Sequence, residues 1–277
     1  MKIGFIDYYL DEWHANNYPR MLQEQSRGRI EVAYAYGMIS SPHSGMTSRQ
    51  WCEKYEIQYC ETIEELIEKS DALVVLSPDN CEMHEELSKL ALASGKKTYI
   101  DKTFAPTLQA AKNIFAMANA GGSPCYSSSA LRFAQQYQPY IGKEIQSAAF
   151  WGPNDVDVYS VHLLEPMMML MKGKIKRAIA LTQGDWANVL YEWEDGRNAS
   201  MLCTGGASPF TATLKSKDEC VNVTAEGNFF EGFIDALIKF FEESIIPVSQ
   251  EETLSIMAAR EAAIKAMQQP GVWVYID

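Results

Sequence analysis

The clearest pattern of apolar and polar positions lies in the N-terminal half of the chain. An apolar run from Ala72 to Leu76 is followed by a polar turn, Ser77-Pro78-Asp79-Asn80. Apolar residues then recur with helical spacing and fall on one side of a predicted helix, at Leu87, Leu90, Ala91 and Leu92. Gly95 is typical of the residue that ends such a helix. The pattern predicts a buried strand, a turn and an amphipathic helix.

A second short strand, Thr98-Tyr99-Ile100, follows that helix and ends at Asp101-Lys102-Thr103. Two strands joined by a helix are expected to be parallel, with a right-handed crossover. Ser77-Pro78 and Lys102 should therefore emerge at the same, carboxyl edge of one sheet. Ligands of open α/β sheets bind along that edge. This placement makes Lys102 a candidate for chemistry.

The residues around this unit repeat the alternation of strand and helix. Strands are predicted at 2–6, 30–36, 57–59 and 124–127, and helices at 13–25, 48–55, 63–69 and 108–118. Such alternation is typical of a doubly wound parallel sheet. The first domain is predicted to be Rossmann-like and to span residues 1–126.

The second half of the chain changes character. Strands of alternating apolar and polar residues are predicted at 145–150, 175–181, 189–193, 199–204, 211–215 and 220–224. They favour a mostly antiparallel open sheet in an α+β domain, residues 127–277. An almost wholly apolar helix, 158–171, should pack between this sheet and another layer. Two more helices, 229–244 and 250–268, and a strand, 272–276, end the chain.

Composition narrows the class of ligand. The 277 residues are 47% apolar and 22% charged, with a net charge of −12. So acidic a chain argues against a nucleic-acid or anionic-membrane partner, and a small molecule fits better. No apolar stretch reaches the ~18 residues of a membrane span, and the start reads as a strand and not a leader. A cytoplasmic protein is expected.

The six cysteines are scattered and form no CxxC pair. We expect reduced thiols that fill space, and no metal site.

The central unit also resembles a known family. Ser77-Pro78, His84, Gly95-Lys96 and Asp101-Lys102-Thr103 are similar in order and spacing to motifs of the glucose-fructose oxidoreductase, inositol dehydrogenase and rhizopine-catabolism (Gfo/Idh/MocA) family. The family has proline where this chain has Thr103. The resemblance implies NAD or NADP as cofactor, and helices after the second sheet that return to the domain boundary. The cofactor would contact Asp7, Tyr9, Tyr36, Ser77, Pro78, His84, Asp101 and Lys102.

The turn after the first strand departs from that family. A dinucleotide-binding turn is glycine-rich so that pyrophosphate can reach backbone N–H groups. Here Asp7, Tyr9 and Glu12 stand at the glycine positions, and Tyr36 stands where an acidic residue grips the ribose. Two readings stay open. Either a dinucleotide binds with its pyrophosphate displaced, using Ser77, Pro78, residues 39–48 and Lys102, or the scaffold has lost its cofactor. Asp7 could also be only a turn or capping residue.

The second domain contributes further candidates. In the resembled family a histidine, matched by His162, exchanges the substrate proton, and the residue four positions earlier is aspartate. Here that position is Val158. Asp157, as a cap outside the helix, or Tyr159 on the same face are the alternative orienting residues. The alternative is that His162 is a core histidine. Arg132 could contact substrate or phosphate, or form a structural ion pair.

The resemblance therefore implies an NAD(P)-dependent oxidoreductase that acts on a secondary alcohol or ketone of a sugar or polyol, with Lys102, Arg132 and His162 at the substrate. A cofactor-free sugar-binding or regulatory protein is the alternative, and a lyase or isomerase that uses Lys102 as base or imine former is a third. Trp186, Tyr191 and Trp193, interpreted as lying on exposed edge strands, suggest a homo-oligomer.

Overall fold

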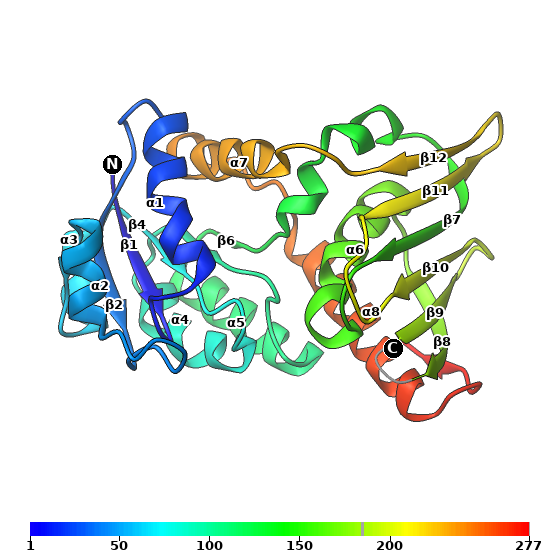
Figure 1. Ribbon diagram of the computed structural model, residues 1–277, viewed down its shortest axis with the longest axis horizontal. Helices are drawn as coiled ribbons and strands as arrows, with labels where there is room; N and C mark the ends of the chain where they lie inside the picture. Colours follow the sequence, from blue (N-terminus) through cyan, green and yellow to red (C-terminus); the bar gives the residue numbers. More distant parts are fainter. Residues whose placement is uncertain (184–185, 277) are drawn as a thin grey trace. The chain divides into compact units, whose positions relative to one another are not determined.

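The structure is a computed structural model that describes residues 1–183 and 186–276. The chain divides into two compact units (Figure 1). The first contains residues 1–127 and 234–250, and the second contains residues 128–233 and 251–277. Each unit is built around its own sheet.

The first unit contains a sheet of six parallel strands, in the order β3-β2-β1-β4-β5-β6. Its strands are β1 (Lys2–Asp7), β2 (Glu31–Gly37), β3 (Gln58–Tyr59), β4 (Ala72–Val75), β5 (Thr98–Ile100) and β6 (Cys125–Tyr126). This is the doubly wound order of the Rossmann fold, with a switch point between β1 and β4 where ligands bind. The predicted Rossmann-like sheet is confirmed.

Helices connect these strands as the alternation predicted. They are α1 (Trp13–Gln25), α2 (Ser48–Tyr55), α3 (Ile63–Lys69), α4 (His84–Ala93) with the 3₁₀ turn η1 (Cys81–Met83) before it, and α5 (Leu108–Gly121). Leu90 differs from the prediction: it is 42% exposed, whereas His84 is fully buried. The covered face of α4 is thus rotated away from Leu90 toward the side of His84, Leu87 and Ala91.

Close packing holds β1 against the helix layer. A Cβ atom added to Gly4 would overlap with Leu66 Cδ2 and Ser70 Oγ, so a side chain at this position would push α3 away. Beyond the exposed first residue of β1, the central strands β1, β4 and β5 are buried on both faces, as in parallel sheets generally.

Residues 234–250 complete the first unit from a distant part of the chain. They include most of α7 (Phe229–Glu243). The ring centroids of Phe240 and Tyr126 are 4.8 Å apart, and the Lys97 ammonium donates to the Phe241 carbonyl. Arg29 forms an ion pair with Glu242 at 2.8 Å.

The second unit contains a seven-stranded sheet, in the order β12-β11-β7-β10-β9-β8-β13. Its strands are β7 (Ile145–Gly152), β8 (Ile175–Gln183), β9 (Trp186–Trp193), β10 (Asn198–Cys203), β11 (Thr211–Ser216), β12 (Cys220–Thr224) and β13 (Val274–Tyr275). All neighbouring pairs are antiparallel except β7 and β10. The predicted α+β fold class is therefore confirmed.

One face of this sheet is covered by helices. α6 (Val156–Met171) contacts β7 and β10, and the Tyr191 hydroxyl donates to the Ala259 carbonyl of α8 (Gln250–Gln268) at 3.3 Å. Tyr191 and Trp193 are 0% and 1% exposed, so their expected place on exposed edge strands is wrong. The reason is that β9 lies between β8 and β10, and both residues have the parity of the covered face. Trp186, of the opposite parity, is 40% exposed.

The apolar helix α6 begins two residues before its predicted start. Asp155 is its N-cap and accepts a hydrogen bond from the Val158 N–H at 2.9 Å. Asp157 therefore lies inside the first turn and not ahead of it. Before α6, the chain passes through two 3₁₀ segments, η2 (Ala130–Phe133) and η3 (Gln135–Tyr140). In the described residues, none of the helices combines the length and apolarity needed to cross a membrane.

Candidate functional site

Lys102 lies directly beyond β5, at the carboxyl edge of the parallel sheet. It is 9% exposed. Within residues 1–183 and 186–276, its ammonium group makes no hydrogen bond or ion pair. Buried ammonium groups are normally paired, because removing the charge from water is costly. A ligand oxygen is the partner that such a group would bind.

His84 holds the segment that carries Lys102. Its side chain is fully buried at the start of α4, and Nδ1 lies 3.0 Å from the carbonyl oxygen of Phe104. Burial lowers the pKa of this imidazole below its usual value, which favours the neutral ring. His84 thus fixes the backbone two residues after Lys102 without placing a second positive charge there.

The turn after β4 borders the same edge. Ser77 has a φ of 88°, in the left-handed region that non-glycine residues rarely adopt. Its hydroxyl donates to the carbonyl of Asn80 at 3.0 Å, which closes the turn. Pro78 is buried beside it. Strained backbone of this kind gathers at binding sites, because surrounding contacts must hold it in place.

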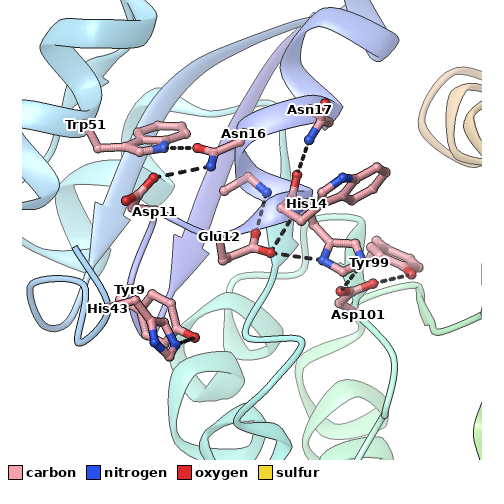
Figure 2. Close-up of polar contacts among 12 residues, drawn as sticks. Tyr9, Asp11, Glu12, His14, Asn16, Asn17, His43, Trp51, Tyr99 and Asp101 are labelled. Carbon is pink, nitrogen blue, oxygen red and sulfur yellow. Dashed lines mark hydrogen bonds and ion pairs between the residues drawn. The ribbon is translucent and has the colours of Figure 1, made fainter. Parts of the chain in front are cut away.

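The N-terminus of α1 is occupied by a side chain of the protein itself. The carboxylate of Glu12 accepts hydrogen bonds from the backbone N–H groups of His14, at 2.7 Å, and of Ala15. The same carboxylate lies 2.9 Å from Nδ1 of the His14 ring. Figure 2 shows Glu12 folded back over the first turn of the helix. The helix end is therefore already neutralised by an anion.

Two further carboxylates lie near this helix end. Nε2 of His14 is 3.8 Å from Asp101, whose other oxygen accepts a hydrogen bond from the Tyr99 hydroxyl at 2.9 Å (Figure 2). Asp7, the last residue of β1, is fully buried. Burial, the charge of Glu12 and, less strongly, that of Asp101 raise the pKa of Asp7 well above its usual value. His14, which no sequence motif singled out, thus lies between the carboxylates of Glu12 and Asp101.

These residues do not fit a dinucleotide in its usual pose. In that pose the pyrophosphate accepts hydrogen bonds from the N–H groups at the start of α1. Here Glu12 takes the N–H groups of His14 and Ala15, and its carboxylate would repel more negative charge. The pyrophosphate of NAD or NADP therefore does not fit on α1 as it stands.

The remaining nucleotide candidates lie along the same unit. Tyr9 is 4% exposed, and its hydroxyl is 3.4 Å from Nε2 of His43. Burial and the charges of Asp79 and Asp7 raise the pKa of Tyr9 to about 12, so it stays a neutral phenol. Tyr36 lies next to the end of β2 and is half-buried. The end of β2 therefore presents a phenol where a dinucleotide-binding strand presents a carboxylate to the ribose.

His162 lies in the second unit, on α6. Its Nδ1 is 2.7 Å from the hydroxyl oxygen of Ser129. Tyr159 packs edge-on against the imidazole, with ring centroids 5.0 Å apart, and Phe210 lies 5.9 Å away. Ser129 was not identified from the sequence as a partner, because a serine 33 residues away in the chain carries no local signal. The ring is therefore held by a hydrogen bond and two aromatic contacts.

Asp157 points elsewhere. Its carboxylate forms an ion pair with Arg260 of α8, and the same guanidinium donates to the Asp157 carbonyl at 2.8 Å. The Asp157 side chain is 73% exposed, whereas that of Arg260 is 5% exposed. The structure places Asp157 with α8, and Ser129 with His162.

Arg132 is paired within its own unit. It is 7% exposed and forms ion pairs with Glu165 at 3.0 Å and with Glu252 at 2.6 Å. Burial raises the pKa of Glu165 to about 7, although the Arg132 charge opposes that shift. The Arg132 guanidinium is therefore already paired with two carboxyl groups, those of Glu165 and Glu252. Among the described residues, no group of three or more His, Cys, Asp or Glu side chains is arranged to hold a metal ion.

Comparison with known proteins gives matches for the N-terminal part of the chain. Residues 16–128 match the model of an oxidoreductase family with an NAD-binding Rossmann fold, GFO_IDH_MocA. A curated relative from Escherichia coli (strain K12), described as the uncharacterized oxidoreductase YhhX, is 33% identical over 105 residues. That match covers 35% of this chain and 30% of the relative, so it spans about a third of each protein.

Solved structures resemble the whole chain in fold. Myo-inositol dehydrogenase from Lactobacillus casei, in complex with NAD(H) and myo-inositol, has a TM-score of 0.82 and 14% identity, and the match covers 100% of this chain and 96% of that one. GenD2 from gentamicin A biosynthesis, in complex with NAD, has a TM-score of 0.81 and 12% identity, with the same coverage. A probable dehydrogenase from Thermotoga maritima gives 0.81 and 13%, covering 99% of this chain and 98% of that one. These likenesses show a shared fold.

Proposed function

Because residues 16–128 match the model of the GFO_IDH_MocA oxidoreductase family, we propose that this protein is an oxidoreductase acting on a secondary alcohol or ketone of a sugar or polyol. The proposal rests above all on Lys102, a buried ammonium group at the ligand-binding edge with no partner among the described residues. The lyase or isomerase reading of Lys102 has no observation of its own in favour.

The role proposed for Lys102 follows from its charge. Oxidation of an alcohol builds negative charge on the oxygen as the proton leaves, and reduction of a ketone does the same as hydride arrives. A hydrogen bond from the Lys102 ammonium would stabilise that charge, more strongly in the transition state than in the ground state. His84 supports this role by holding the backbone at Phe104.

His162 is the proposed group that accepts or returns the hydroxyl proton, because imidazole titrates near neutral pH. Its hydrogen bond to Ser129 at 2.7 Å supports this proposal, since it fixes the orientation of the imidazole ring. Tyr159 would hold the ring through its edge-on contact. Arg132 and Asp157 are proposed to support the second unit through their ion pairs.

The proposed redox partner is NAD or NADP, in keeping with the family description. Nicotinamide supplies hydride chemistry that side chains lack. The proposed roles of Lys102 and His162 concern only the reacting oxygen and its proton, and they do not depend on where a pyrophosphate lies.

A second candidate function is a cofactor-free sugar-binding or regulatory protein on the same scaffold. The carboxylate of Glu12 at the start of α1 favours it, because the N–H groups that pyrophosphate would use are taken. Both candidates share a small-molecule ligand at the sheet edge.

A thermal-shift series separates the two candidates. NAD, NADH, NADP and NADPH are added singly to the full chain, and a panel of sugars and polyols is added with and without them. A ligand at 100 times its Kd raises the stability of the folded state by about 2.7 kcal/mol. The oxidoreductase proposal expects stabilisation by a nicotinamide nucleotide and by a polyol. Stabilisation by a sugar alone would support the binding protein instead.

The proposal extends to location and assembly. The six cysteines are free thiols, which fits a reducing compartment such as the cytoplasm. We further propose a homo-oligomer formed through the uncovered face of the second sheet, where Leu181, Trp186 and Leu190 are exposed.

A further inference from the structure

Glu12 is an unusual residue for the start of a helix. Serine, threonine, aspartate and asparagine are the preferred N-caps, because their short side chains reach the N–H groups of the first turn. Glu12 has an extended backbone, and its longer side chain folds back so that one carboxylate meets the N–H groups of both His14 and Ala15. The side chain is only 4% exposed, so this is a buried and fixed arrangement.

The carboxylate has the chemistry of the group that it replaces. A phosphate at a helix N-terminus is an anion that accepts hydrogen bonds from the same free N–H groups. Here Glu12 carries the negative charge and makes those bonds. We propose that Glu12 is a specificity-determining residue that takes the place of a ligand phosphate on α1, so that this sheet edge selects ligands which place no phosphate there.

The surroundings of Glu12 reinforce this selection. Nδ1 of the His14 ring lies 2.9 Å from the Glu12 carboxylate, while Nε2 lies 3.8 Å from Asp101. The His14 imidazole therefore already lies between two acidic side chains, Glu12 and Asp101. Asp7 is fully buried at the end of β1, directly before this turn. A phosphate on α1 would have to displace the Glu12 side chain, and the acidic side chains of Asp7 and Asp101 are already close by.

The inference defines a ligand class for the proposed function. It predicts substrates that are free sugars or polyols, not sugar phosphates bound on α1, and a dinucleotide whose pyrophosphate lies away from that helix. The prediction that the substrate is a sugar or polyol alcohol rests on the proposed function. The exclusion of phosphate from α1 rests on Glu12 alone and can be tested without any turnover.

The test compares binding of ADP-ribose to the wild-type chain and to Glu12→Ser by isothermal titration calorimetry. Serine keeps an N-cap for α1 while it removes the charge and opens the position. We expect ADP-ribose to bind the variant at least about tenfold more tightly, a change of about 1.4 kcal/mol. Equal affinities in the two proteins, whether strong or unmeasurably weak, would overturn the inference. Glu24→Ser, at the exposed far end of α1, controls for the loss of one negative charge.

A second measurement keeps the test independent of the variant's folding. In wild-type protein labelled for NMR, ADP-ribose should leave the backbone amide signals of His14 and Ala15 unchanged, because Glu12 holds both groups. Movement of these two signals on titration would show phosphate on α1 and would overturn the inference. Failure of the proposed function is seen separately, as the absence of stabilisation by any sugar or polyol.

Discussion

The hydroxyl oxygen of Ser129 lies 2.7 Å from Nδ1 of His162, although 33 residues separate them in the chain. Ser129 sits at the start of η2, where its side chain also accepts a hydrogen bond from the Leu131 N–H at 3.2 Å. The serine is therefore held by the backbone on one side while it orients the imidazole on the other. In the proposed reaction it is a positioning residue for His162.

Ser129→Ala should reduce turnover without removing the acid–base group. We expect kcat to fall by about tenfold, equivalent to about 1.4 kcal/mol, because the ring loses the bond that sets its orientation. The pH–rate profile should shift at the same time, and Ser129→Thr should restore both. Ser128→Ala is the matched control, since that hydroxyl bonds to a backbone carbonyl at 3.2 Å. A lower melting temperature with an unchanged pH profile would argue for a purely structural serine.

Lys102→Met should abolish most of the activity while the fold survives. Loss of a positioned donor at the reacting oxygen typically costs 10²–10⁴ in rate, so we expect kcat/KM to fall by about 10³-fold. Because no ion pair is lost among the described residues, the melting temperature should stay the same or rise. Steady-state kinetics with the best polyol from the thermal-shift panel measure this. Lys112→Met, on the exposed face of α5, is the control, and an equal loss there would contradict the proposed role.

Glu165 should make the stability of the protein depend on pH. Burial raises its pKa in the folded state to about 7, above the value near 4.5 of the unfolded chain. Between these values the unfolded state ionises while the folded state keeps its proton, so the stability from this group falls as pH rises from about 4.5 to 7. The full change is about 3 kcal/mol.

Urea unfolding of the wild type and Glu165→Gln at pH 5 and pH 8 measures this effect. The glutamine variant does not ionise, and Arg132 keeps its second partner, Glu252. The variant should therefore gain stability relative to the wild type on going from pH 5 to pH 8. The exposed Glu24→Gln should follow the wild type at both pH values. Parallel curves for Glu165→Gln and the wild type would show that Glu165 is ionised throughout.

Leu190→Lys should dissociate the proposed homo-oligomer. Leu190 is 38% exposed on β9 and pairs with Ile179 of β8, while Leu181 nearby is 62% exposed. A charge placed on this face would be costly to bury against a second copy. Sedimentation velocity should show the 31.1 kDa species for the variant and a multiple of it for the wild type. Lys217→Leu, which removes a positive charge in the loop between β11 and β12, is the control. A monomeric wild type would contradict this part of the proposal.

Much of the fold could be predicted from the sequence because the signals were local. The apolar run at Ala72–Leu76 and the alternation in the second half gave strands of the correct type, within a few residues of their ends. The parity of β9 was also visible in the sequence: Trp186 and Tyr191 differ by an odd number of positions and must face opposite ways. The two residues therefore cannot both lie on the exposed face of the sheet.

The site depends on relationships that no local pattern carries. The sequence shows that Glu12 is out of place in a dinucleotide turn. Glutamate is a poor N-cap by type, however, so only the folded side chain shows that it fills the helix end. The predicted start of α6 is two residues late, because Asp155 is the N-cap and Asp157 lies inside the helix, where it pairs with Arg260, 103 residues later. Ser129 and His162 meet only through the tertiary fold.

The return of residues 234–250 to the first unit has a practical result for anyone dividing this protein. A fragment ending at residue 127 would lack Phe240, whose ring lies 4.8 Å from that of Tyr126, and the carbonyl of Phe241 that receives the Lys97 ammonium. Tyr126 is fully buried in the complete chain and would become accessible to water. Each unit is made of two separate segments of the chain, so no single division of the gene yields either unit intact. Recombination between relatives would have to exchange both units together, or both segments of one unit at once.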